Sequence, residues 1–381
     1  MASTTQHQLL AHFVEAMKAV YGPFDRITTP EAAARFAFPS HPGAGGHRGR
    51  YLWTDAFGVV NFVTLSRQAS PSLPSSSDVY LALAKRLVHA VHDTLGRTRD
   101  GASRLPRATD QEPLKGGLRI GKPAAAGPDA DGQYHHYLTL WMFALNRLAV
   151  AARDRRYNDL AVQLARAVHP HFLVRGGGGP PTSMVWKVST DLDEVLVPSE
   201  GALDAVTGYV VFRLLQRTAA RLGGGEQGSR AGGDDGVLSS EINDYKHLME
   251  HGGRLRPRAS RDPLDLGMGL WTCHWAPREP WAAAMAEAGL ASARSVMDET
   301  RGVVARDPSR RLSFRELGAC MGLRCVVGPG DALKERADAV VDFWRRHLDE
   351  TTEEDLRPIS KVMLAAAMVP GAWKNDSLAD E

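Results

Sequence analysis

The strongest constraint on the fold is that amphipathic helices follow one another in pairs along almost the whole chain. Apolar residues recur at i, i+3, i+4 and i+7 in many stretches, most clearly at 77–96. That spacing puts the apolar side chains on one face of a helix. Strand-like alternation is scarce, and we expect only one short β element, within 184–192. The sequence therefore predicts an all-α protein.

The predicted helices form six pairs. Five of them follow in chain order: 55–66 with 78–95, 134–152 with 157–171, 201–222 with 239–251, 264–275 with 279–297, and 314–327 with 331–348. A helix at 6–20 and another at 356–368 remain, and we expect these N- and C-terminal helices to pair and close a ring. This pattern predicts an (α/α)6 toroid of six helical hairpins. An open HEAT-like solenoid would have a similar periodicity, but the closing pair favours the toroid.

The two helices of each pair differ in composition. The first helices are rich in Gly, Ala and aromatic residues and poor in charge, as in 137–149 and 314–325. The second helices carry Arg, Glu and Lys along one stripe. Because a helix that is apolar all round is buried on both sides, we expect the first helices to form an inner ring that the second helices cover.

Three stretches without sustained periodicity are predicted loops, at 97–130, 175–183 and 223–237. They are rich in Gly and Pro or lack a repeat, which is typical of connections. We expect none of them to separate domains, so the prediction is a single domain over 1–381.

Composition narrows the class of protein. Lys and Arg total 46 and Asp and Glu total 44, and a net charge of +2 does not favour a nucleic-acid partner. No window reaches 18 apolar residues, so we expect no membrane span. The three cysteines form no CxxC pair and residues 1–22 lack a signal-peptide pattern, which favours a reducing, cytoplasmic location. A homo-oligomer is possible if Trp275, Trp281 and Trp344 prove exposed.

A segment dense in polar and aromatic residues precedes or opens each first helix. In a toroid these six segments meet at one rim and form a concave binding site: 51–58, 131–137, 197–204, 261–267, 311–318 and 353–361. A glycine-rich segment at 114–122 also allows close backbone approach, and its Arg119 and Lys122 are suited to a carboxylate or phosphate.

The number of hairpins and the composition of the rim resemble those of the six-hairpin glycosidase superfamily. That superfamily includes glycoside hydrolases and unsaturated glucuronyl hydrolases, and the sugar 2-epimerases are nearby in fold. Segments 131–149, 184–204 and 312–318 also resemble uncharacterised bacterial and fungal proteins of this shape. The resemblance implies a carbohydrate-active enzyme.

Glycoside hydrolysis needs two carboxyl groups across the scissile bond, one of them protonated near neutral pH. We expect Asp131 to be the general acid because it opens an aromatic segment, although Asp is also a favoured helix cap. Glu200 and Asp204 are the next catalytic candidates, since residues four apart share one helical face. Glu200 alternatively supplies only favourable charge in a first helical turn.

Substrate-binding candidates surround these carboxylates. Trp53 and Asp55 would stack on and hydrogen-bond a sugar ring, unless Asp55 only caps its helix. Lys187 is expected to form a salt bridge with Asp191 or Asp193. The remaining candidates are Arg119, Gln133, Tyr134, His136, Trp186, Arg315, Glu316, Arg357 and Lys361. For Arg315 and Glu316 a structural ion pair is the alternative, and for Arg357 and Lys361 a substrate carboxylate or a rim acid is the expected partner.

Histidines support a second chemistry. His135 and His136 are adjacent, and either could form a proton-transfer pair with His274, as an epimerase would need. The alternative is a hydrogen-bonded core histidine. His247 and His251 are spaced i, i+4 without the Glu of HExxH, so we expect no metal site and no cofactor.

The sequence thus favours a glycoside hydrolase acting on a small or uronate-containing oligosaccharide. A sugar epimerase or isomerase that uses a His pair is the alternative, and a non-enzymatic helical scaffold is the third. Fold alone does not choose among them, because one superfold hosts many functions.

Overall fold

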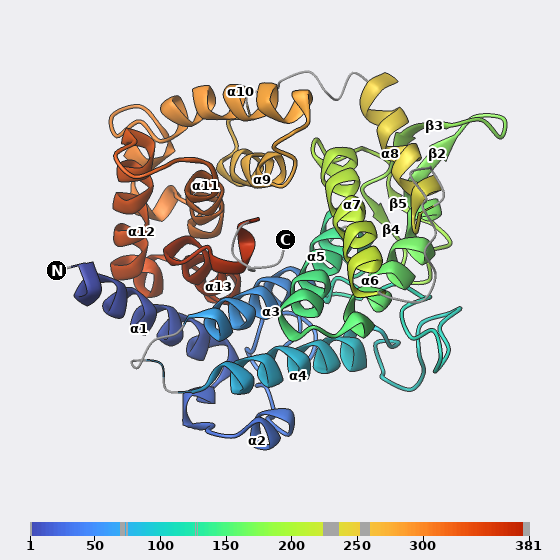
Figure 1. Cartoon of the computed structure of the whole chain (residues 1–381), viewed down its shortest axis with the longest axis horizontal. Helices are drawn as coiled ribbons and strands as arrows, with labels where there is room; N and C mark the ends of the chain where they lie inside the picture. Colours follow the sequence, from blue (N-terminus) through green and yellow to red (C-terminus); the bar gives the residue numbers. More distant parts are fainter. Residues whose placement is uncertain are drawn as a thin grey trace. The chain divides into compact units, whose positions relative to one another are not determined.

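The computed structural model describes residues 2–68, 73, 75–125, 127, 129–223, 236–251 and 260–375. Over these residues the chain has thirteen α-helices and five short strands (Figure 1). The predicted all-α class is therefore confirmed. None of the described helices is both long and apolar enough to cross a membrane.

The chain divides into two compact units. One contains both chain ends and consists of Met1–Gly45, Val60–Leu83 and Leu255–Glu381, and we call it the terminal unit. The other, the middle unit, consists of Gly46–Val59 and Ala84–Arg254. Helices α3 (Leu52–Arg67) and α4 (Ser77–Leu95) each contribute residues to both units. That the two units make one domain stays a prediction.

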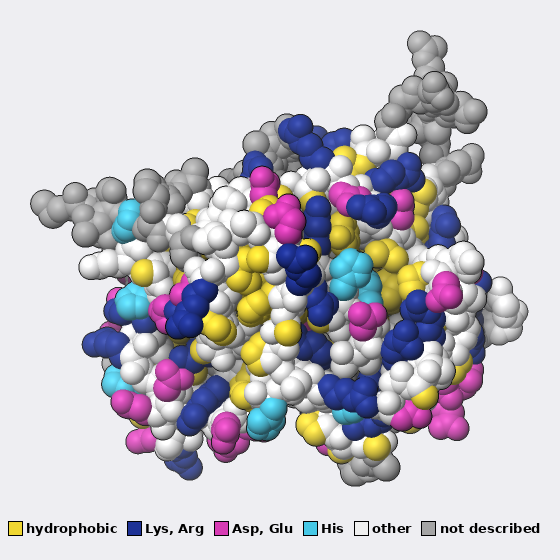
Figure 2. Space-filling view, turned by 90° about the horizontal axis from the view of Figure 1, so that it is seen from below, with side chains coloured by type: hydrophobic (Ala, Val, Ile, Leu, Met, Phe, Trp, Pro, Cys, Tyr) yellow, Lys and Arg dark blue, Asp and Glu magenta, His cyan; other side chains and the backbone are white. Residues whose placement is uncertain are grey.

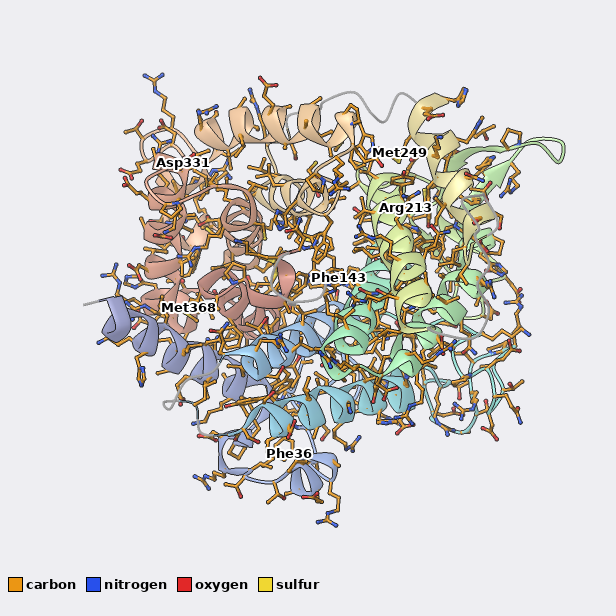
Figure 3. The ribbon with its side chains drawn as sticks, in the orientation of Figure 1. Phe36, Phe143, Arg213, Met249, Asp331 and Met368 are labelled. Atoms are coloured by element: carbon orange, nitrogen blue, oxygen red, sulfur yellow. The ribbon has the colours of Figure 1, made fainter. Side chains whose placement is uncertain are left out.

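In the terminal unit the predicted pairs are confirmed, and the helices near the two chain ends pack against each other (Figure 1). The pairs are α1 (Ala2–Tyr21) with α13 (Arg357–Met368), α9 (Pro263–His274) with α10 (Pro280–Val296), and α11 (Ser313–Val326) with α12 (Ala332–Thr351). The first helices α9, α11 and α13 also pack side by side, and Figure 3 labels Met368 at the end of α13 and Asp331 at the start of α12.

Glycines let α9 and α11 approach each other closely. A Cβ atom at Gly267 would lie 2.0 Å from the carbonyl oxygen of Gly318, and one at Gly322 would lie 2.0 Å from that of Gly267. No side chain fits at such a distance, so the glycine content of the first helices reflects backbone contact between neighbours. Ten of the fourteen residues of α11 are buried, against six of the twenty in α12. Within this unit the inner and outer roles of the helices are as predicted.

The middle unit repeats the arrangement. Helix α5 (His135–Ala152) packs on α6 (Arg155–Val168), α7 (Asp204–Leu222) packs on α8 (Ser239–His251), and α5 also packs on α7. Fourteen of eighteen residues of α5 are buried, including Phe143, which Figure 3 labels, against six of fourteen in α6. A satisfied N-cap explains where α6 begins, because the Asp154 side chain accepts the backbone N–H of Arg156.

The β structure is more extensive than predicted. Strands β1 (Gln133–Tyr134), β4 (Lys187–Val188) and β5 (Val195–Val197) form an antiparallel sheet in the order β1-β4-β5. Strands β2 (Leu173–Arg175) and β3 (Pro181–Met184) form a hairpin, so the prediction of a plain loop over 175–183 is wrong at both of its ends. The short β element expected within 184–192 is confirmed by β4, whereas the other strands, of two to four residues, are too short to show alternation in the sequence.

Three further segments can be compared with the prediction. The five-residue helix α2 (Pro30–Ala34) was not predicted; the Thr29 hydroxyl caps it at 3.3 Å from the backbone nitrogen of Ala32. The described part of 97–130 contains no helix or strand, as expected. Most of the predicted loop 223–237 lies outside the described residues.

The suggested homo-oligomer depended on three tryptophans being exposed. Trp275 and Trp344 are buried within the chain, whereas Trp281 is partly exposed, so an oligomer stays a prediction. Basic and acidic side chains are interspersed on the face shown in Figure 2, as the small net charge suggests.

Candidate active site

The middle unit gathers five aromatic side chains and one histidine into what we call the aromatic cluster: Tyr51, Trp53, Tyr134, His136, Tyr137 and Trp186. They come from the starts of α3 and α5 and from the residue before β4. Four of them, Trp53, Tyr134, His136 and Trp186, were predicted to bind substrate. The structure brings these four together.

Three rings of the cluster are nearly parallel. Tyr134 lies 5.5 Å from His136 and 5.6 Å from Trp186 between ring centroids, each at an interplanar angle of 12°. His136 lies 5.7 Å from Trp186 at 24°. Because the three centroid distances are equal within 0.2 Å, the rings form a triangle of offset faces and not a column. Trp186 is 39% exposed, so part of this aromatic surface is open to a ligand.

A hydrogen bond sets the protonation of His136. The indole Nε1 of Trp186 donates to His136 Nδ1 at 2.9 Å. The accepting Nδ1 carries no proton, so the ring is neutral and its proton sits on Nε2. Burial lowers the pKa of His136 to about 4, which keeps this form at neutral pH. The cluster therefore presents a neutral imidazole N–H donor.

Trp53 adds a second donor to the cluster. Its ring is tilted against His136 and Tyr137, with centroids 5.9 and 5.2 Å away. The side chain is 5% exposed, and its Nε1 has no hydrogen-bond partner among the described residues. Buried polar groups are normally paired, so a buried indole N–H without a partner is unusual.

His135, next to His136 in the chain, lies in a buried group with Asp204 and Tyr245. His135 Nε2 is 2.7 Å from the Tyr245 hydroxyl, and its Nδ1 is 3.5 Å from Asp204 Oδ1. Burial disfavours the ionised form of Asp204, but the two histidines and the Gly201 N–H outweigh it, and the pKa of Asp204 lies below its usual value. His135 and Asp204, both predicted to be catalytic, are thus brought together, but both are buried.

Asp131, the predicted general acid, is buried and surrounded by hydrogen-bond donors. Its Oδ2 accepts from Arg99 Nη1 at 2.8 Å and from Arg119. Its Oδ1 accepts backbone N–H groups of Gly121, at 2.9 Å, and of two further residues, Lys122 and Gly132. Both carboxylate oxygens of Asp131 are therefore engaged by donors from the protein itself. The role predicted from the sequence does not suit this environment, and Arg119 serves Asp131 in place of a ligand.

Other candidates near the cluster also bond to groups of the protein itself. Asp55 is buried, and its Oδ1 is 2.9 Å from Arg50. The Gln133 side chain bonds only backbone groups, among them the N–H of Leu118 at 2.9 Å. Lys187 donates to the carbonyl oxygen of Ala130, so the predicted salt bridge with Asp191 or Asp193 is wrong.

Glu200 differs from the other predicted catalytic carboxylates because it is only partly buried. Its Oε2 accepts the Met184 N–H at 3.4 Å, a weak bond by distance. Met184 lies two residues before Trp186, so Glu200 approaches the segment that carries the cluster's exposed indole.

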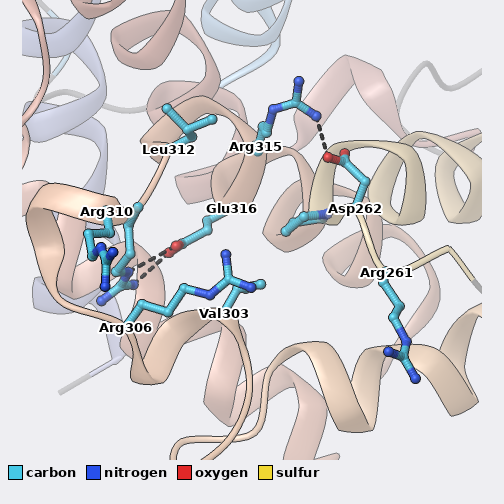
Figure 4. A pocket seen from close by; sticks show the side chains of 10 residues that line it. Arg261, Asp262, Val303, Arg306, Arg310, Leu312, Arg315 and Glu316 are labelled. Atoms are coloured by element: carbon cyan, nitrogen blue, oxygen red, sulfur yellow. Dashed lines mark hydrogen bonds and ion pairs between the residues drawn. The ribbon is translucent and has the colours of Figure 1, made fainter.

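The terminal unit contains a pocket at the starts of α9 and α11, and Arg315 and Glu316 both line it (Figure 4). The predicted ion pair between these two neighbours is wrong, because Arg311 is the partner of Glu316 and Arg315 pairs with Asp262. Trp344 Nε1 also donates to Glu316 at 2.9 Å.

The remaining candidates in the terminal unit are engaged by nearby groups. Arg357 donates to the Thr352 carbonyl at 3.0 Å, and Lys361 lies 2.7 Å from Asp349. His274 Nε2 accepts the backbone N–H of Asn375 at 3.1 Å. None of these contacts suggests a ligand.

Sequence reasoning missed Tyr51, Tyr137 and Tyr245. Tyr51 and Tyr137 belong to the aromatic segments 51–58 and 131–137. Their closeness in sequence to Trp53 and His136 could have predicted that they share the same site. Tyr245 lies on the outer helix α8, and nothing in the sequence pairs it with His135. A Cβ at Gly208 would come within 2.4 Å of its ring, so the ring occupies space that this glycine leaves.

Comparison with known proteins adds information on the fold. No protein-family model matches the chain, and no curated protein matches it. Among solved structures, the chain is similar to a sugar epimerase from a ruminal bacterium, with a TM-score of 0.52 and 10% sequence identity. The match covers 93% of this chain and 98% of the epimerase chain. At that identity the likeness shows a shared fold.

Proposed function

We propose that this protein is a carbohydrate-active enzyme of the epimerase or isomerase type, and that its sugar binds at the aromatic cluster. The observation that carries the proposal is the neutral His136 ring, held by Trp186 beside an open aromatic surface. The fold shared with a sugar epimerase supports the same class.

The cluster has the properties that sugar binding needs. The C–H groups on one face of a sugar are apolar, so that face loses little when it leaves water to cover an aromatic ring. The hydroxyl groups at its edge need hydrogen-bond partners, which Trp53 Nε1 and His136 Nε2 would supply.

Epimerisation next to a carbonyl group moves one proton. A base takes the proton from the carbon beside the carbonyl of the open-chain sugar, and the electron pair of the broken C–H bond forms an enediolate. The His136 Nε2–H would donate to the oxygen on which negative charge develops, a role that a neutral imidazole can fill. Return of a proton to the opposite face gives the epimer.

Glu200 is our candidate for the base. It is the predicted catalytic carboxylate of the middle unit that is partly exposed, and it contacts the segment leading to Trp186. A carboxylate within hydrogen-bond reach of a C–H next to a carbonyl can act as a general base.

The glycoside hydrolase prediction has less support. That reaction needs one carboxyl group to hold a proton and a second one across the bond. In the middle unit Asp131 and Asp55 pair with arginines and Asp204 faces His135. The pKa of Asp204 lies below its usual value, which does not suit a general acid.

Proton exchange distinguishes the two reactions. The chain would be incubated in D2O with a panel of free aldoses, ketoses and short oligosaccharides and followed by NMR. We expect deuterium at the carbon next to the carbonyl and a new epimer or isomer, without new reducing ends. New reducing ends without deuteration would make the protein a hydrolase, and neither change with any sugar would refute the proposal.

A further inference from the structure

The pocket of the terminal unit is strongly basic. It has a volume of about 360 Å³ and is lined by five arginines: Arg261, Arg306, Arg310, Arg311 and Arg315 (Figure 4). The same lining contains two acidic residues, Asp262 and Glu316. Five positive and two negative charges leave a net charge of +3 around one small cavity.

Two of the arginines are neutralised and held in place. Arg311 donates to both carboxylate oxygens of Glu316, and its guanidinium lies 4.3 Å from the centre of the Phe343 ring. Arg315 pairs with Asp262, as the dashed lines in Figure 4 show. These pairs consume both carboxylates of the pocket.

The other three arginines have no such partner. Among the described residues, no carboxylate lies within ion-pair distance of Arg261, Arg306 or Arg310, and none of their side chains donates a hydrogen bond. In Figure 4, Arg306 extends beside Glu316, whereas the Arg261 side chain extends away from the Asp262 carboxylate. All three are exposed, and Arg310 lies near enough to Asp307 to help lower the pKa of that carboxyl, so part of their mutual repulsion is screened. A bound oxyanion would relieve the repulsion that remains.

Helix α11 adds to the positive potential. Its N-cap residue Leu312 lines the pocket and provides no side-chain hydrogen bond to the first N–H groups of the helix. Unsatisfied N–H groups at the start of a helix carry partial positive charge and favour an anion. By contrast, Asp262 caps α9 through the N–H groups of Leu264 and Asp265.

We propose that this pocket binds a small molecule carrying a phosphate monoester, of about the size of a sugar phosphate. A phosphate monoester carries close to two negative charges at neutral pH, and arginine forks bind its oxygens in pairs. A monocarboxylate would neutralise only one of the three unpaired arginines. The volume lies at the lower end of the ~300–1,000 Å³ typical of ligand pockets, which suits a small organic molecule better than a bare ion.

Calorimetric titration with four probes tests the proposal: glucose 6-phosphate, glucose, glucuronate and inorganic phosphate. We expect glucose 6-phosphate to bind, glucose not to bind, and the other two to bind at least about tenfold more weakly. No binding of glucose 6-phosphate would overturn the proposal. Equal binding of glucuronate would overturn the preference for phosphate, and equal binding of inorganic phosphate would overturn the larger ligand.

Substitutions test whether binding occurs in this pocket or reflects a general attraction of anions to arginines on the surface. Arg306→Gln with Arg310→Gln should weaken glucose 6-phosphate binding by about tenfold or more, and Arg261→Gln should weaken it as well. The matched control is Arg301→Gln, an exposed arginine outside the pocket on the segment before Val303. Equal losses in the control and in the pocket variants would overturn the assignment. Because the readout is binding, failure here leaves the proposed sugar chemistry of the middle unit untouched.

Discussion

The aromatic cluster and the arginine pocket differ most in the charge of the side chains that line them. In the cluster the side chains are neutral, and their polar atoms are the ring nitrogens of Trp53, His136 and Trp186 and three tyrosine hydroxyls, two of which lie 2.7 Å apart. The pocket is lined by seven charged and three apolar residues, and three of its guanidinium groups have no carboxylate within ion-pair distance among the described residues. A neutral surface of this kind suits an uncharged sugar, whereas the pocket needs an anion. The comparison therefore predicts two ligand chemistries in one chain.

We expect the buried carboxylates of the middle unit to stabilise the fold and not to act on the substrate. Asp131→Asn should therefore lower the free energy of unfolding by about 3–5 kcal/mol, because it leaves the buried Arg119 without its counter-charge. Chemical denaturation measures this change. If stability is unchanged and turnover is lost, Asp131 is catalytic after all and the comparison fails.

The next largest effect concerns the neutral donor of the cluster. His136→Phe keeps a flat ring but removes Nε2–H, so we expect turnover to fall by about 10²–10³-fold, the cost typical of one donor to a developing oxyanion. Glucose 6-phosphate binding in the terminal unit should not change. A variant that keeps full turnover would show that His136 does not act on the substrate.

The two regions should also differ in how they affect the pH dependence of stability. Burial lowers the pKa of His92 to about 3 and that of His136 to about 4, and both histidines belong to the middle unit. The unfolded chain takes up protons near pH 6.5 while the folded chain does not, so stability is complete above pH 6.5 and falls as the pH drops towards 4. Each histidine contributes a slope of at most about 1.4 kcal/mol per pH unit.

Unfolding measured at several pH values checks this slope, and His136→Phe should reduce it. The arginines of the pocket stay charged throughout this range and contribute no slope. A stability that is flat between pH 4 and 6.5 would contradict the neutral state assigned to the cluster.

The smallest expected effect concerns the bond that orients His136. Trp186→Phe keeps an aromatic ring but removes the donor to Nδ1, at a cost of about 1 kcal/mol in transition-state stabilisation. We expect kcat/KM to fall by a factor of about five with little change in melting temperature, since Trp186 is 39% exposed. A loss as large as that of His136→Phe would mean that Trp186 itself contacts the substrate.

The sequence alone determined most of the fold. Helical periodicity extends over a dozen residues or more in each element, so it identified every long helix, including the α1–α13 pair. It also showed which helices are buried on both sides, because a charge-poor, glycine-rich helix such as α11 is stable only between neighbours. Apart from β4, which lies in the β element expected within 184–192, the strands of two to four residues left no detectable pattern.

Only the tertiary structure decided what the polar residues do. Trp53, His136 and Trp186 were predicted one by one, but their stacking and the tautomer of His136 depend on a contact between residues 136 and 186. The sequence gives no hint that Arg119 reaches Asp131, or that Glu316 pairs with Arg311 and not with adjacent Arg315. The sequence identifies an aspartate or glutamate but not its surroundings. Whether the carboxyl group holds a proton or is ionised beside a guanidinium depends on its neighbours in the folded structure.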